Sequence, residues 1–332
     1  MVSIKHPERL IPFNEYFHRS CLFNVMIPVL QYYDVNQSFL WAHTYHFNVI
    51  KNGLLQKKYV SSLPFAALLN EAGIEIVNGD ATEKLSIAVS QLLTEGLPVI
   101  MWVDSYYMQL KQDAYQRIHW PHCLLIYGIE SEKGLIHCIE NTSVESMAYS
   151  KRIIMLQELE QAHEGYLMHF SDTPFYDQMA SLFGIRKNPE NITQVNNDVW
   201  TQYHSNVCAQ KSIIKGGINK WSLFAENIIQ LCNNKDEFWE LYDDIAYNAN
   251  DLLNASKADL YHFKSLHGSD HSLCNEQSML LNTYKKYRNI IFKKKYTNKI
   301  NADNIANVIY GTQISEREIN ILNIIESMNN YD

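Results

Sequence analysis

The sequence is poor in cysteine, and it lacks long apolar runs. Its 332 residues include six cysteines, none with the Cys-x-x-Cys spacing of many zinc and redox sites. We therefore expect reduced thiols, and neither a disulfide scaffold nor a structural zinc site. No run of about 18 uncharged apolar residues is present, so no membrane-spanning helix is predicted. Residues 1–13 have no apolar core of signal-peptide length, which favours the cytoplasm.

Glycine-rich phosphate-binding motifs are also missing, because neither Gly-x-Gly-x-x-Gly nor a P-loop occurs. The 28 basic and 36 acidic residues give a net charge of −8, which argues against general affinity for nucleic acid. What the sequence does have is 46% hydrophobic and only 19% charged residues. A chain of this length and composition predicts folded structure in two domains.

The first half of the chain shows helical patterns followed by strand patterns. Residues 21–33 have apolar residues at near-helical spacing, and Pro28 predicts a kink or an end near residue 27. Amphipathic patterns predict further helices at 62–73 and 82–95, and apolar runs predict strands at 97–104, 122–130 and 134–141. Because helices and strands are segregated, we expect an α+β domain with an antiparallel sheet.

The second half is predicted to be mostly helical. A segment rich in asparagine, with glycine and proline, at residues 183–198 is the expected linker. It divides the chain into a first domain at 1–182 and a helical domain at 199–332. The expected helices lie at residues 221–231, 236–253, 276–292 and 305–327.

Three positions favour cysteine chemistry. Cys21 begins a predicted helix, whose N-terminal dipole favours a thiolate; the alternative is a buried structural cysteine. His122 opens one predicted strand, while Glu140 and Asn141 end the next. If a turn at 131–134 pairs these strands antiparallel, His122 lies beside Glu140 or Asn141. Either residue would orient the imidazole toward the thiol of Cys21, and we favour Glu140.

This order of cysteine, histidine and acidic or amide residue resembles papain-like cysteine peptidases, especially the C39-like branch. The closer resemblance is to the N-terminal domain of the butirosin biosynthesis protein H family, and it covers about residues 10–170. It is carried by three motifs: His18-x-x-Cys21, the run from Leu97 to Asp104 followed by x-Tyr106-Tyr107, and His122-Cys123-Leu124-Leu125-Ile126-Tyr127-Gly128.

The resemblance implies a papain-like fold that serves as an acyltransferase. The expected donor is an acyl-carrier-protein thioester, whose phosphopantetheine is brought by the partner, and the expected acceptor is an amine of a small natural product. No cofactor of the protein's own is implied. One alternative is a peptidase or an amide or thioester hydrolase with the same triad, and another is a non-catalytic peptidase-like binding module. The sequence does not settle whether the chain forms a homodimer.

Several further residues are expected to bind substrate. Papain-like enzymes place a glutamine six residues before the cysteine as an oxyanion donor, but Glu15 stands here. Asn14 or the Cys21 backbone N–H would then have to donate. The motif residue His18 is a further candidate. Another group follows the strand before His122 and is expected to line a pocket that excludes water: Asp104, Tyr106 and Tyr107. An ordinary turn-capping role is an equal alternative for Asp104.

Two charged features have simple alternatives to function. His119 and His122 lie three residues apart, but without a further spaced pair we expect no metal site. The seven basic residues of segment 285–299, which has no acid, form a candidate docking surface for an acidic carrier protein. A solvated helix face is the more common reason for such a run.

Overall fold

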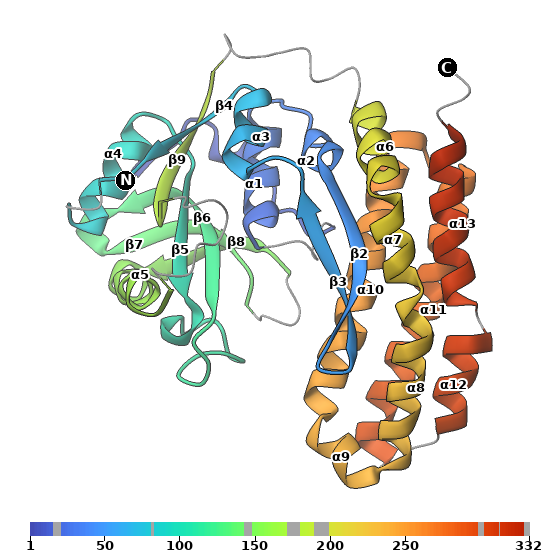
Figure 1. Ribbon diagram of the computed structural model, residues 1–332. Helices are drawn as coiled ribbons and strands as arrows, with labels where there is room; N and C mark the ends of the chain where they lie inside the picture. The colour runs from blue at the N-terminus through green and yellow to red at the C-terminus, as the bar shows by residue number, and fades with distance from the viewer. Residues whose placement is uncertain are drawn as a thin grey trace. The chain divides into compact units, whose positions relative to one another are not determined.

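The computed structural model describes residues 1–15, 21–80, 83–142, 148–170, 180–188, 199–297, 302–311 and 313–328. The chain divides into two compact units (Figure 1). The first unit comprises Met1–Phe39 and Leu63–Asn197, and the second comprises Leu40–Ser62 and Asp198–Asp332.

The first unit is built on a seven-stranded antiparallel sheet. Its main order is β4-β9-β5-β6-β7-β8, and β1 pairs with β6. The strands are β1 (Val2–Ser3), β4 (Ile74–Asn78), β5 (Val99–Asp104), β6 (Pro121–Glu130), β7 (Leu135–Glu140), β8 (Ser150–Met155) and β9 (Leu182–Lys187). The predicted α+β class and antiparallel pairing are confirmed.

The helices of the first unit are α1 (Cys21–Tyr32), α3 (Phe65–Glu71), α4 (Leu85–Thr94) and α5 (Leu156–Phe170), with short 3-10 turns η1 (Pro7–Arg9), η2 (Ser105–Tyr107) and η3 (Ser131–Lys133). The predicted end of the first helix near residue 27 is wrong, because α1 continues through Pro28. All residues from Leu22 to Leu30 are buried, and packing on every side outweighs the loss of one backbone hydrogen bond.

The second unit combines a β-hairpin with a set of helices. The hairpin consists of β2 (Thr44–Lys51) and β3 (Leu54–Ser61). The helices are α2 (Phe39–Ala42), whose first residue belongs to the first unit, α6 (Val199–Ala209), α7 (Lys211–Ile218), α8 (Lys220–Asn233), α9 (Lys235–Glu240), α10 (Tyr242–His267), α11 (Ser272–Thr297), α12 (Ala302–Gly311) and α13 (Ile314–Ser327).

This hairpin corrects the predicted domain boundary at residues 1–182. The buried side chains of Leu54 and Leu55 share a core with Trp221 and Phe224 of α8, so segment 40–62 belongs with the C-terminal helices. Burial of these apolar groups supplies the driving force for that association. The alternation of polar and apolar residues from Thr44 to Val49 in β2 was overlooked, and β3 (LLQKKYVS) has no regular alternation.

The predicted linker at 183–198 is also partly wrong. Residues 182–187 form β9, which pairs with both β4 and β5 inside the sheet. Phe183 and Ile185 of this strand are buried. The segment was misjudged because its pairing partners lie about a hundred residues earlier in the chain. Residues 189–198 lie outside the described residues.

A buried carboxylate joins the hairpin to three helices in the second unit. Glu318 of α13 accepts hydrogen bonds from Asn48 Nδ2 (2.8 Å), Trp221 Nε1 (2.8 Å) and the Tyr284 hydroxyl (3.0 Å). It also forms an ion pair with the buried ammonium of Lys57. The charge of Glu318 is thus compensated, as burial requires.

None of the described helices has the length and apolar character needed to cross a bilayer.

Candidate active site

Cys21 is the first residue of α1 and is partly buried. Its thiol is within hydrogen-bonding reach of the His122 ring, the Cys123 thiol and the Cys123 backbone. The sulfur therefore lies beside the backbone of β6. It interacts there with His122 and Cys123, two successive residues whose side chains point to opposite faces of the sheet. The structure brings together the two residues, 101 positions apart, on which cysteine chemistry depends.

His122 is the second residue of β6 and is 4% exposed. Its Nε2 lies 2.9 Å from Glu140 Oε1 at the end of β7, so Nδ1 is the nitrogen left for the thiol. The antiparallel pairing of β6 and β7 across the turn η3 produces this contact. The ring of Tyr149 is nearly parallel to that of His122, with 6.3 Å between their centroids.

Glu140 is fully buried and is held by a second cation. Its Oε1 accepts from Lys111 Nζ (2.7 Å) and from the Asn141 backbone N–H (2.6 Å), in addition to the contact with His122. The Lys111 side chain has no exposed surface. Of the two candidates for orienting the imidazole, Glu140 makes the contact, while the side chain of Asn141 hydrogen-bonds with Lys111.

These contacts shift the pKa values of the three groups in a consistent direction. Burial opposes ionisation of Glu140, but the charges of His122 and Lys111 outweigh it and hold the carboxyl pKa at about 2. Burial likewise opposes protonation of His122, yet Glu140 and the Cys21 sulfur raise the imidazole pKa above its usual 6.5. A hydrogen bond from the Cys123 thiol, followed by the charge of His122, lowers the pKa of Cys21 well below 9.0.

A lowered thiol pKa beside a raised imidazole pKa favours transfer of the proton from Cys21 to His122, which gives a thiolate–imidazolium pair. Such a pair supplies a strong nucleophile and a proton donor at adjacent atoms. Cys123, by contrast, has its pKa raised well above 9.0 by burial and by Cys21. The arrangement can therefore perform nucleophilic attack on an acyl carbon, with Cys21 as the attacking residue.

Asp104 ends β5 on the opposite face of the sheet from His122. Val103 is directly opposite His122 in the β5–β6 pair, so Asp104 points to the other face of the sheet. That face is covered by α5, where Tyr166 stacks on Trp102.

The role of Asp104, Tyr106 and Tyr107 in lining a pocket beside Cys21 stays a prediction. Asp104 accepts from the Tyr106 backbone N–H at 3.0 Å, which confirms its capping alternative. The rings of both tyrosines contact His119.

Two residues before Cys21, Asn14 and His18, were predicted to bind substrate. Asn14 donates from Nδ2 to the Tyr149 carbonyl (3.1 Å) and accepts at Oδ1 from the Tyr149 N–H (2.6 Å). Asn14 therefore fixes the segment that carries the Tyr149 ring, and its role as an oxyanion donor stays a prediction. His18 lies outside the described residues.

The function proposed below is based on the chemistry of Cys21, His122, Glu140 and Lys111. No protein-family model and no curated protein sequence matches this chain. The resemblance to the butirosin protein H family, which rests on three short motifs, thus stays an expectation.

Three residues of this site were not predicted from the sequence: Lys111, Cys123 as a partner of Cys21, and Tyr149. The sequence does contain a signal for Lys111, because the apolar residues Met108 and Ala114 stand three positions to either side of it. Both are buried in the structure. A lysine at such spacing lies on the buried face of a turn, where a charge needs a partner. Tyr149 had no comparable signal, since its ring reaches His122 only through the folded chain.

Proposed function

We propose that this protein is a cysteine-dependent acyltransferase with Cys21 as its nucleophile. The observation that carries the proposal is the continuous chain of contacts from Cys21 through His122 to Glu140 and Lys111. A carboxylate that fixes one imidazole nitrogen leaves the other to exchange a proton with the thiol.

In the first step the Cys21 thiolate attacks the carbonyl carbon of an acyl thioester. The new C–S bond forms as the old one breaks, and the protonated His122 gives its proton to the departing thiolate. One thioester replaces another, so this step is close to thermoneutral. The product is an acyl-enzyme with a neutral imidazole.

In the second step an amine attacks the acyl-enzyme, and His122 takes the proton that the nitrogen loses. The amide bond forms, and the Cys21 thiolate leaves beside the renewed imidazolium. Exchange of a thioester for an amide makes this step strongly downhill. The burial of His122 and Glu140 limits the access of water that would hydrolyse the intermediate.

The resemblance noted in the sequence extends the proposal. It favours a papain-like peptidase fold for the first unit, a carrier-protein thioester as donor and an amine of a small natural product as acceptor. Reaction in the cytoplasm belongs to the same proposal. Within the basic segment, Lys285, Lys286 and Lys293 are exposed, which supports docking of an acidic carrier protein there.

Intact-mass spectrometry after incubation with a panel of acyl thioesters tests the proposal. We expect a covalent acyl adduct that is lost in Cys21→Ala. The matched control is Cys208→Ala, because Cys208 Sγ also lies near an imidazole, 3.4 Å from His204 Nε2, but the pKa of Cys208 is raised by burial. The adduct should survive in this control.

Addition of an amine then separates the possible reactions. An amide that forms only when amine is supplied supports a transferase. Release of free acid at the same rate without amine identifies a hydrolase that uses the same residues. If no adduct forms and iodoacetamide does not label Cys21 selectively, the domain is a non-catalytic binding module.

A further inference from the structure

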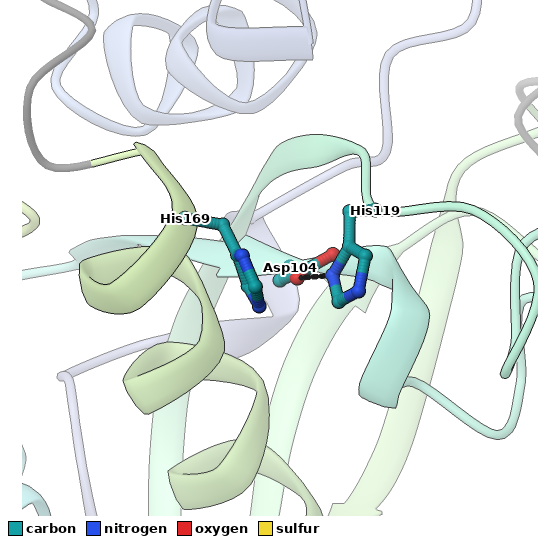
Figure 2. A group of neighbouring side chains, drawn as sticks. All are labelled: Asp104, His119 and His169. Carbon is teal, nitrogen blue, oxygen red and sulfur yellow. Dashed lines mark hydrogen bonds and ion pairs between the residues drawn. The ribbon is translucent and has the colours of Figure 1, made fainter.

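A second cluster of side chains with metal-ligand chemistry lies on the face of the sheet covered by α5. Asp104 at the end of β5, His119 in the segment before β6 and His169 near the end of α5 converge there (Figure 2). One ligand atom from each residue lies within 4.8 Å of the other two. The rings of His119 and His169 are 4.0 Å apart between centroids.

The carboxylate of this cluster is fixed before any ligand arrives. Asp104 is fully buried, and its Oδ1 accepts from the backbone N–H groups of Tyr106 (3.0 Å) and Trp120 (3.1 Å). Its Oδ2 faces His119 Nδ1 at 2.6 Å. The two imidazoles, by contrast, are exposed to solvent, and the His119 side chain is 39% exposed.

Close packing of α5 on the sheet brings His169 into this cluster. Gly165 lies one turn before His169 on the same side of the helix. A Cβ atom at Gly165 would come within 2.3 Å of the Tyr107 ring and within 3.3 Å of Asp104 Cβ. The glycine thus allows the helix to approach near enough for His169 to reach the carboxylate.

We propose that Asp104, His119 and His169 bind a divalent transition-metal ion of the zinc class. Two imidazoles and one carboxylate form a common three-residue ligand set for zinc, which leaves one position for water or another ligand. Bond lengths of about 2.0–2.1 Å in tetrahedral geometry place neighbouring ligand atoms about 3.3 Å apart. The cluster reaches this spacing by small movements of the two exposed imidazoles around the fixed carboxylate.

The site has a structural consequence that is independent of Cys21. It joins the segment between β5 and β6 to the last turn of α5, because each of these elements supplies a ligand. A bound ion therefore stabilises that segment by the free energy of binding to the folded state. The ion also fixes His119 by a metal–nitrogen bond, in addition to the contact that His119 already makes with Asp104.

Isothermal titration with zinc chloride tests the site in the Cys21→Ala protein, in which the thiol beside His122 no longer competes for the ion. We expect one ion per chain with a dissociation constant tighter than about 10 μM. His119→Ala and His169→Ala should each weaken binding at least about tenfold. His137→Ala is the matched control, because His137 Nε2 also contacts a carboxylate, Glu130 Oε1 at 2.8 Å, but belongs to no described three-ligand cluster.

Cobalt(II) absorption in the visible range gives a second readout that reports the ligands directly. The bands should appear in the Cys21→Ala protein and disappear with His169→Ala, which changes an exposed residue and leaves the fold intact. Zinc binding weaker than about 10 μM would overturn the proposal. Equal zinc affinity in His169→Ala and His137→Ala would overturn it as well.

Discussion

Lys111 determines which charges the buried triad can hold. Its ammonium compensates the carboxylate of Glu140, so the pair contributes no net charge. Cys21 and His122 can then exchange a proton between neutral and ion-pair forms, and the total charge of the four groups is zero in either form. Because a buried site strongly disfavours net charge, this balance allows the thiolate to form at low cost.

Replacement of Lys111 by methionine should disturb both ionisation and stability. The charge of Lys111 lowers the pKa of His122, so its loss should raise that pKa, as NMR titration of the ring protons would show. Removing one partner of a buried ion pair also costs about 3–5 kcal/mol in the free energy of unfolding. Lys133→Met, which breaks an exposed pair with Glu130, should change neither quantity appreciably.

Cys123 has a separate effect on the nucleophile. Its thiol hydrogen bond is the largest cause of the lowered pKa of Cys21, so Cys123→Ala should raise that pKa. We expect the pH midpoint for alkylation of Cys21 by iodoacetamide to move to higher pH, as loss of a hydrogen bond to the thiolate implies, while the rate above both midpoints changes little. Cys138→Ala is the control, and an unchanged midpoint in Cys123→Ala would contradict the role of Cys123.

At the scale of elements, the packing of α5 on the sheet depends on one missing side chain. Gly165→Ala would place a methyl group against the Tyr107 ring and should lower the free energy of unfolding by about 1–3 kcal/mol. Gly216→Ala in α7 is a matched helical control, because among the described residues nothing beyond its own stretch of helix comes within 4 Å of an added Cβ. Urea denaturation should show a loss in the first variant and a small gain in the second.

Elements with a strong local pattern could be predicted from the sequence, and elements that depend on distant partners could not. The buried strand at 99–104 and the helix beginning at Cys21 follow from apolar runs and spacing. The hairpin had a sequence signal that was missed, the dipeptide Asn52-Gly53. Both residues have positive φ angles in the structure, as a tight Asn-Gly hairpin turn requires. Strand β9 pairs with β4 and β5, which lie far from it in the sequence.

The same distinction applies to the candidate site. A single turn between two strands was enough to predict that His122 and Glu140 meet. The side of the sheet on which Asp104 lies depends on the exact register of β5 against β6, because a shift of one residue moves every side chain to the other face. The partner of Lys111 is 29 residues away, and local spacing does not identify it.

At the scale of the whole molecule, the chain enters the second unit twice. Segment 40–62 and the C-terminal helices form one core, and Glu318 connects them by hydrogen bonds and an ion pair. The polar contact between Asn48 and Glu318 spans 270 positions. Stability of the hairpin therefore depends on residues near the other end of the described chain.

Substitution of Glu318 by glutamine tests this dependence. The variant keeps the shape of the side chain but leaves the buried ammonium of Lys57 without its counter-ion, which should cost about 3–5 kcal/mol. We expect faster proteolysis within 44–61 and a lower urea midpoint. Glu326→Gln, which breaks the more exposed ion pair with Lys211, should leave both unchanged; equal effects would show that Glu318 has no special role.

The divided second unit also affects how the protein is made. Ribosomes deliver Leu54 and Leu55 long before the α8 residues that bury them, so a nascent chain must carry an unprotected apolar hairpin during much of its synthesis. Closure over so many positions is slow compared with local helix formation. Exchange of one unit between relatives would likewise need two segments to be moved together, because no single cut separates them.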